Sequence, residues 1–210
     1  MTRLARLDFP NGFFHVFNRG LNKKKIFLSG SDYNYFLTKL ESLLKELGHR
    51  IYCYCLLPNH YHFLIENRKE KLSKLMGRLL TSYSMYFNKK HSKNGPLFQN
   101  RFKSIVVQKE SYFLELSRYI HLNPVKLGLV NKPEDYPYSS LNEIISGNKY
   151  EIVNKESVLK LIGEKKNDLK DYLNFIYQGI DLDLEEFNPF RTLKEIYGSA
   201  KFTTAQFKKM

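Results

Sequence analysis

The stretch Ile51–Glu66, IYCYCLLPNHYHFLIE, decides the predicted fold. Aromatic, β-branched and other apolar residues fill two runs, Ile51–Leu57 and His60–Glu66, and such runs are typical of strands. Pro58-Asn59 between them is a turn signal. The stretch therefore predicts a β-hairpin.

The second strand of this hairpin begins with His60-Tyr61-His62. Alternate side chains of a strand share a face, so His60 and His62 project together while Tyr61 points to the other side. Two imidazoles on one face can ligate a divalent metal and leave positions open for a third ligand and for substrate oxygens. The competing interpretation is a pair of exposed or hydrogen-bonded histidines at a strand start, and the spacing alone does not decide.

The segments on either side of the hairpin complete a mixed fold. The expected elements are a strand at Phe13–Asn18, a helix from Ser31 or Asp32 to about Leu47, the hairpin, a helix at Leu72–His91, a strand at Lys103–Gln108 and a helix at Ser111–Leu122 that Asn123-Pro124 ends. This order predicts an α+β fold, a ferredoxin-like (RRM-like) four-stranded antiparallel sheet with helices on one face.

The chain divides into a first domain at residues 1–140 and a mainly helical C-terminal extension at residues 141–210, whose role the sequence does not indicate. A Pro-, Tyr- and Ser-rich connection, KPEDYPYSS, separates the two. Within the extension, helices are expected at Ser157–Gly163, at Asp168–Tyr177 and near Leu193, with the acidic stretch Asp181–Glu186 as a linker.

Composition excludes several protein classes. Hydrophobic residues make up 42 % of the 210 residues, enough for a buried core, and no run approaches the roughly 20 apolar residues that span a bilayer. The N-terminus, MTRLARLDFP, has no apolar segment of the kind that a secretory signal contains. Cys53 and Cys55 are expected as buried thiols in a reducing compartment, with metal binding as the lesser alternative.

Positive charge is concentrated in one part of the chain. The net charge is +13. Residues 1–130 hold 22 of the 34 lysines and arginines and 8 of the 21 acidic residues, a net of +14, so the rest of the chain is close to neutral. The first part is therefore expected to meet a polyanion, most simply a nucleic acid. A basic surface that only aids solubility is the alternative.

A second candidate group lies in the motif YIHLN at 119–123. Helical residues four apart share a face, so Tyr119 and Asn123 could present a hydroxyl nucleophile and an amide oxygen together. An amide oxygen is a reasonable ligand for Mg²⁺ or Mn²⁺. The spacing is weak by itself, because it recurs at two other tyrosines. Tyr119 is preferred because its predicted helix lies in the basic part, beside Arg118.

Several motifs together resemble a known family. PNHYHFLIE, the upstream FHVFNRGLNKKKIF, GPLFQNRFKS, and RYIHLNPVKLGLV followed by DYPYSS resemble the REP-associated tyrosine transposases. These are related to the small insertion-sequence transposases of the HUH superfamily, which have a single catalytic tyrosine. The resemblance covers about residues 10–140, so it implies that residues 1–140 form the catalytic domain. Tyr61 stands where the family has a bulky apolar residue, which leaves the same-face argument intact.

The resemblance implies an enzyme, a metal-dependent DNA transesterase from a bacterium. It implies nicking and rejoining of single-stranded, hairpin-bearing DNA through a 5′-phosphotyrosine intermediate with Mg²⁺ or Mn²⁺ as cofactor. His60 and His62 fall on the metal histidines, Tyr119 on the nucleophile and Asn123 on an amide ligand. Cytoplasmic location, on the nucleoid when bound to DNA, and no membrane partner are expected. Relatives include dimers and monomers, so a homodimer stays open.

DNA contacts are expected from cations near these motifs. Aromatic residues interleave with the charges, which suits a single-stranded or hairpin substrate through base stacking. The candidates are Arg19, Lys23, Lys24 and Lys25 after the first strand, Arg101 and Lys103 at the start of the fourth, and Arg118 and His121 on the Tyr119 helix. His15 is interpreted as a satisfied histidine of the sheet.

Three other functions compete with this one. A non-catalytic nucleic-acid-binding module with an RRM-like sheet would not need His60, His62 and Tyr119 together, and would expose aromatics on the sheet. A replication-initiation-type nickase would share the histidine pair. A hydrolytic nuclease usually relies on clustered acids, which residues 1–130 lack. The DNA target and the metal used in the cell stay open, as does whether the protein is an active mobile element or a recruited host protein.

Overall fold

The computed structural model describes residues 7–107, 111–147, 150–153, 158–159, 168–190 and 196–197. Its first seven regular elements follow the predicted order of strand, helix, strand, strand, helix, strand and helix. They are β1 (Phe13–Arg19), α1 (Gly30–Leu47), β2 (Arg50–Leu57), β3 (His60–Glu66), α2 (Leu72–Lys90), β4 (Lys103–Val107) and α3 (Ser111–Lys126). Then come α4 (Ser140–Ser146), α6 (Asp168–Tyr177) and β5 (Ile196–Tyr197), and short 3-10 helices lie at Leu21–Lys23, Pro133–Asp135 and Glu185–Phe187.

The strands form one sheet in the order β2-β3-β1-β4-β5. The first four are antiparallel to their neighbours, which confirms the predicted ferredoxin-like α+β sheet. The short β5 adds a parallel edge beside β4, which the sequence did not predict. In the register of the two central strands, Phe17 pairs with His62 and Arg19 with His60. The basic end of β1 therefore lies beside the start of the histidine strand.

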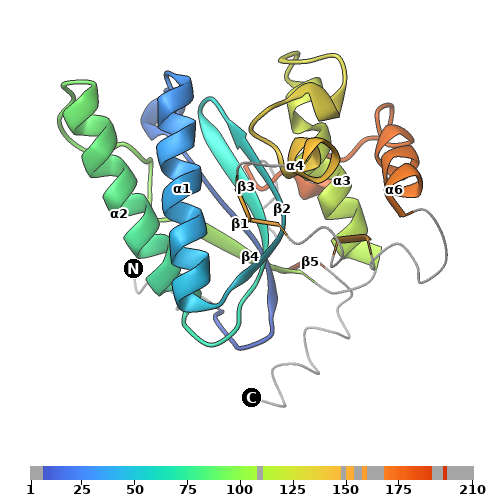
Figure 1. Ribbon diagram of the computed structural model, residues 1–210, viewed down its shortest axis with the longest axis horizontal. Helices are drawn as coiled ribbons and strands as arrows, with labels where there is room; N and C mark the ends of the chain where they lie inside the picture. Colours follow the sequence, from blue (N-terminus) through green and yellow to red (C-terminus); the bar gives the residue numbers. More distant parts are fainter. Residues whose placement is uncertain are drawn as a thin grey trace.

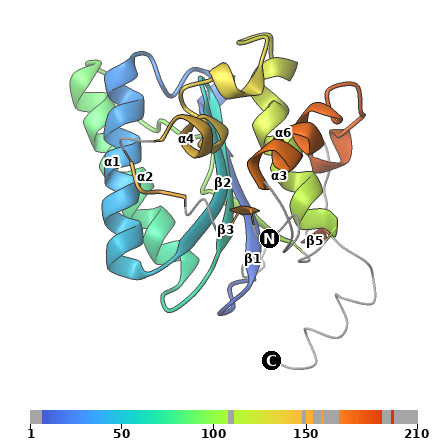
Figure 2. The same cartoon turned by 45° about the vertical axis from the view of Figure 1, so that its right-hand side comes forward.

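Both faces of the sheet are covered by helices. Figure 1 shows α1 and α2 on one side of the sheet and α3, α4 and α6 on the other, and the turned view in Figure 2 agrees. The first face packs residues such as Phe14 and Phe63 against α1 and α2. The second packs residues such as Leu64 and Ile105 against α3 and the C-terminal helices. The prediction of helices on one face of the sheet holds for α1 and α2, whereas α3 covers the opposite face.

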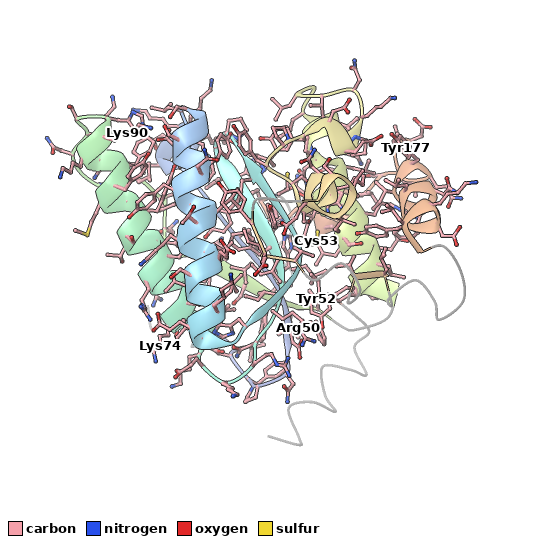
Figure 3. The ribbon with its side chains drawn as sticks, in the orientation of Figure 1. Arg50, Tyr52, Cys53, Lys74, Lys90 and Tyr177 are labelled. Atoms are coloured by element: carbon pink, nitrogen blue, oxygen red, sulfur yellow. The ribbon has the colours of Figure 1, made fainter. Side chains whose placement is uncertain are left out.

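The alternation of side chains along β2 and β3 decides what each layer contains. Cys53 and Cys55 are buried free thiols in the layer that faces α3, and Figure 3 labels Cys53 beside this layer. Burial raises the pKa of both thiols. The expected buried cysteines are thus confirmed, and the histidines of β3 share their layer.

The N-terminus of α1 is held by a buried carboxylate. Ser29 is the N-cap and forms a capping box with Asp32. Asp32 is fully buried and also accepts from Lys90 Nζ at 2.7 Å and His91 Nε2 at 3.0 Å. Lys90 is the last residue of α2, and its label in Figure 3 marks this end of the helix. One carboxylate therefore ties the start of α1 to the end of α2.

The helix α3 extends further than the sequence predicts. The expected end at Asn123-Pro124 is wrong, because α3 continues to Lys126 with Pro124 inside it. Proline disfavours the helical conformation of the preceding residue and lacks an N–H. Here the carbonyls of Asn123 and Pro124 still accept from Leu127 and Leu129. Burial of this turn outweighs the local preference.

The described part of the C-terminal extension shares the core of the second face. Tyr172, Ile176 and Phe187 belong to the same buried cluster as residues of α3 and the sheet. The prediction of a helix at Asp168–Tyr177 is confirmed. Of the helix expected at Ser157–Gly163, only 158–159 are described and they are helical, and the helix expected near Leu193 lies outside the described residues. No helix of the described part is long and apolar enough to cross a membrane.

Candidate active site

His60 and His62 lie side by side on the face of the sheet that α3 covers. Their ring centroids are 5.0 Å apart and the rings are nearly perpendicular. His62 is fully buried and His60 is partly exposed. The strand periodicity predicted this shared projection, and the structure confirms it.

The protonation state of the His60 and His62 imidazoles suits metal ligation. Burial lowers the pKa of His62 well below its usual value, with smaller contributions from His60 and His15. Burial, with the positive charge of Arg19, lowers the pKa of His60 to about 4. Both are therefore neutral at physiological pH, which is the form that binds a metal. Within the described residues, the buried Nε2 of His62 has no hydrogen-bond partner, as a metal-binding nitrogen requires.

Tyr119 of the same chain lies against His62, one member of the histidine pair. It belongs to α3, and its ring centroid is 5.6 Å from that of His62 in an edge-on arrangement. The side chain is 6 % exposed. Burial raises the pKa of its phenol, and a hydrogen bond with Asn123 opposes that rise in part. The nucleophile candidate thus reaches the histidines without help from a second protomer.

Asn123 follows Tyr119 by one helical turn, as the sequence predicted. It is buried, and its Nδ2 donates to the carbonyl oxygen of Tyr119 at 2.8 Å. This bond occupies the amide nitrogen and leaves Oδ1 as the atom for a cation. Among the described residues there is no group of three or more His, Cys, Asp and Glu side chains arranged for a metal. A cation here would need amide, water or substrate oxygens beside the two imidazoles.

Six of the eight residues predicted to bind DNA lie on β1, on the turn after it, or at the start of β4, close to the histidine hairpin. Lys23, Lys24 and Lys25 are exposed on the turn after β1. That turn is tied to the histidine hairpin, because Asn59 Nδ2 donates to the carbonyl of Lys23 at 3.2 Å. A hollow of about 100 Å³ lies at the end of β1. It is lined by Phe17, Asn18, Arg19, Gln99, Asn100, Arg101, Lys103, Pro189 and Phe190.

Comparison with known proteins agrees with these motifs. The sequence model of the family described as Transposase IS200 like matches residues 10–123. The chain belongs to this IS200-like transposase family. A Haemophilus influenzae protein, whose curated name places it provisionally among the REP-associated tyrosine transposases, is 28 % identical over 158 residues, covering 69 % of this chain and 89 % of that protein.

A solved structure of a REP-associated tyrosine transposase bound to a REP hairpin has the same fold. It matches with a TM-score of 0.59 and 19 % identity, covering 72 % of this chain and 90 % of the other. Together with the family match, these similarities confirm the resemblance to REP-associated tyrosine transposases that the motifs indicated.

Two residues of this transposase that were predicted to contact DNA, Arg118 and His121, have buried side chains. Arg118 is 5 % exposed; its Nε donates to the carbonyl of Phe175 at 2.8 Å and its guanidinium stacks on the Phe175 ring. His121 is fully buried, with its ring nitrogens bonded to Ser140 and Tyr172. The assignment of both as DNA-contacting residues is wrong, because their side chains join α3 to α4 and α6. Their position on the Tyr119 helix suggested proximity to the DNA, but their side chains point toward α4 and α6.

Three residues of the transposase site were not assigned to it from sequence. His15 on β1 bonds to His62, Asn59 bonds to His60, and Phe190 packs edge-on against both histidines. Asn59 could have been found from its place beside His60. Finding His15 requires the register of β1 against β3, and Phe190 stands in a region of the sequence without a recognisable motif.

Proposed function

We propose that this transposase nicks and rejoins single-stranded, hairpin-bearing DNA with Tyr119 as the nucleophile. The observation that carries the proposal is the placement of the Tyr119 ring 5.6 Å from His62, whose buried Nε2 has no hydrogen-bond partner within the described residues. A tyrosine packed on one of two adjacent neutral imidazoles supports its use as the nucleophile of a transesterase.

The proposed reaction exchanges one phosphodiester for another. The phenolic oxygen of Tyr119 attacks the scissile phosphorus and its proton leaves to solvent. The bond from phosphorus to the 3′ oxygen breaks, and that oxygen takes a proton and becomes a free 3′-OH. The 5′ end stays bonded to Tyr119 as a phosphotyrosine. Attack by another 3′-OH reverses the step and joins DNA without ATP, because the covalent link retains the energy of the phosphodiester.

The residues present fit a divalent cation. His60 and His62 would hold it through their nitrogens, and Asn123 would offer an amide oxygen. When bound, Mg²⁺ or Mn²⁺ would act as a Lewis acid on a non-bridging phosphate oxygen. Burial keeps both histidines neutral, so protons do not compete for their nitrogens near pH 7.

A hairpin substrate is supported by the related solved structure and by the charge on this chain. The REP-associated tyrosine transposase of the same fold is bound to a REP hairpin. Here Arg19, Arg101 and Lys103 line a hollow beside the site, and the exposed lysines at 23–25 lie on the adjoining turn. Cations of this kind bind phosphates along a strand, with aromatic rings available for stacking.

The competing functions are less well supported. An RNA-recognition module exposes aromatic residues on its sheet, whereas α3, α4 and α6 cover that face here. A replication-initiation nickase would share the histidine pair, but the family match is to transposases. A hydrolytic nuclease would use water in place of Tyr119, which the experiment below distinguishes.

The test follows the two halves of a labelled hairpin with a single-stranded flank, incubated with Mg²⁺ or Mn²⁺ and separated under denaturing conditions. We expect the 3′-labelled half to stay attached to the protein and the 5′-labelled half to be released with a 3′-OH. Tyr119→Phe should remove the adduct, whereas Tyr112→Phe, on the same helix, should keep it.

Three results would contradict the proposal. An adduct that persists in Tyr119→Phe would exclude this nucleophile. Cleavage without an adduct would favour the hydrolytic nuclease. Absence of both on a broad panel of hairpins would favour the binding module.

A further inference from the structure

Each histidine of the pair has its Nδ1 atom in a hydrogen bond to a neighbouring side chain. His60 Nδ1 lies 2.6 Å from Asn59 Oδ1. His62 Nδ1 lies 2.9 Å from His15 Nε2. The two partners come from different places in the fold, the β2–β3 turn and the neighbouring strand β1. The same nitrogen is therefore occupied in both rings.

The Asn59 amide determines which ring nitrogen of His60 carries the proton. Its Nδ2 donates to the carbonyl oxygen of Lys23 at 3.2 Å, so Oδ1 is the atom that faces His60. A carbonyl oxygen can only accept, so His60 Nδ1 must be the donor. A neutral imidazole has one N–H, and the Nε2 of His60 therefore presents a lone pair.

For His62 the proposed metal indicates the tautomer, because its hydrogen-bond partner is another imidazole that can donate or accept. Its Nε2 is buried and has no hydrogen-bond partner among the described residues. The bond between His62 Nδ1 and His15 Nε2 forms with either ring as the donor, but the cation that the proposed function places at the pair requires a lone pair on His62 Nε2. With the proton on Nδ1, His62 donates to His15 Nε2, and its own Nε2 presents a lone pair as well. His15 then carries its proton on Nδ1.

We propose that Asn59 and His15 are positioning residues that hold His60 and His62 as Nδ1–H tautomers, so that both rings direct Nε2 toward one divalent cation. This inference rests on the proposed function, which places a metal at the pair. Neither residue contacts the metal or the DNA in this proposal. They act through the histidines, as hydrogen-bond partners of metal-binding imidazoles do in many metal sites.

The rest of the site is consistent with this role for His15. The His15 and His62 rings stack with centroids 5.1 Å apart, and Tyr119 packs on both, 6.3 Å from His15 and 5.6 Å from His62. His15 is fully buried, so its ring cannot turn freely. The hydrogen bond from His62 therefore meets an acceptor whose position is fixed by packing.

The first measurement is the tautomer of each histidine in the metal-free protein, read from two-bond ¹H–¹⁵N correlations of the imidazole rings. We expect the Nδ1–H form for both His60 and His62. In Asn59→Leu the His60 signal should become a mixture of tautomers, and in His15→Leu the His62 signal should do so. His15→Gln restores an acceptor and should keep His62 in the Nδ1–H form.

The second measurement is Mn²⁺ affinity by electron paramagnetic resonance. We expect each leucine variant to bind Mn²⁺ about 10- to 100-fold more weakly, and His15→Gln to bind within a few-fold of wild type. His91→Gln, a histidine at the end of α2, is the control that should leave the affinity and both tautomers unchanged. Circular dichroism melts show whether each variant is folded, and His15→Gln keeps the test decisive if His15→Leu does not fold.

Two outcomes would overturn the inference: an Nε2–H tautomer of either histidine in the wild type, or unchanged Mn²⁺ affinity in both folded leucine variants. Failure of the proposed function gives a different result. In that case the wild type shows the expected tautomers but binds no Mn²⁺, which supports the hydrogen-bond assignment and removes the metal from the proposed function.

Discussion

The phenyl ring of Phe190 meets the imidazole of His62 edge-on, with their centroids 6.0 Å apart. The same ring packs on His60 at 5.4 Å, and the Arg19 guanidinium lies 4.8 Å above it. Phe187, three residues earlier, packs against Tyr119. A short C-terminal segment thus packs on both the histidine pair and the nucleophile, and we expect the Phe190 ring to restrict the approach of a phosphate to the pair.

Replacement of Phe190 by alanine should therefore accelerate the proposed reaction. An aromatic contact contributes about 0.5–1.5 kcal/mol and a cation–π contact about 0.5–1 kcal/mol, so losing both should raise the single-turnover rate of adduct formation by about fivefold to seventyfold. Leu182→Ala, an exposed residue of the same extension, is the matched control. An unchanged rate in folded Phe190→Ala would mean that the ring does not restrict access, and a slower rate would mean that it helps to bind DNA.

The cations around the hollow should control the salt dependence of hairpin binding. Arg101 and Lys103 are exposed and line the hollow, so each alanine variant should bind more weakly and lower the slope of log affinity against log salt by about 0.7–0.9 per lost phosphate contact. Fluorescence anisotropy at several salt concentrations measures this slope. Arg78→Ala, which removes an exposed arginine of α2 paired with Glu46, should leave it unchanged; an equal fall there would mean a non-specific charge effect.

Arg118 should matter for stability and not for DNA binding. Its guanidinium donates to Phe175 and Glu115, and hydrogen bonds of a charged group contribute about 1.5–3 kcal/mol. Arg118→Leu should therefore lower the free energy of unfolding by about 2–3 kcal/mol in urea titrations. Gly179→Ala should act in the same direction, because its added carbon would overlap the Arg118 side chain. A changed salt dependence of hairpin binding in either variant would mean that Arg118 contacts DNA.

The local patterns of the sequence were sufficient for the hairpin and for the histidine pair. Period-two alternation in HYHFLIE places His60 and His62 on one face whatever surrounds them, and the structure agrees. The i, i+4 spacing of Tyr119 and Asn123 is equally local. These features depend on residues close in sequence, so reading them needs no knowledge of the tertiary packing.

The parts that the sequence did not provide depend on contacts between distant segments. The end of α3 was misplaced because burial of the turn at Pro124 outweighs the local preference. Arg118 and His121 share a helix with Tyr119, but only the docking of α6 shows which way they face. The role of His15 follows from the register of β1 against β3, and Phe190 reaches the site through an irregular segment.

The pH dependence of adduct formation should reflect the buried phenol. Burial raises the pKa of Tyr119 above its ordinary value of 10, so the phenol is protonated throughout the neutral range. The phenolate fraction, and with it the rate, should rise about tenfold per pH unit between pH 6 and 9 if chemistry limits the reaction. The lowered pKa of His60, about 4, predicts no loss of activity from histidine protonation above about pH 5. Single-turnover rates with Mg²⁺ check this, and a plateau below pH 8 would contradict it.

The stability of the α1–α2 layer should depend on Asp32. Burial alone would raise the pKa of this carboxyl, but hydrogen bonds from Lys90, the Leu28 amide and His91 hold it well below its usual value. A lowered pKa in the folded state means that the stabilisation is fully present above about pH 4, the pKa in the unfolded chain, and is lost as the pH falls through the folded value.

Asp32→Asn should accordingly lower the free energy of unfolding by about 2–3 kcal/mol at pH 7, the range for buried hydrogen bonds to a charged group. The difference from wild type should shrink as the pH falls from 4 toward 2, because the carboxyl of the unfolded chain then binds a proton and the unfolded state is stabilised. Urea titrations at pH 7 and near pH 2 measure this difference. The control is Glu46→Gln, which removes an exposed ion pair with Arg78 on the same helix and should change the free energy of unfolding little at either pH. A deficit in Asp32→Asn that stays constant down to pH 2 would mean that the amide disturbs packing, and that the charge of Asp32 does not stabilise the contact between α1 and α2.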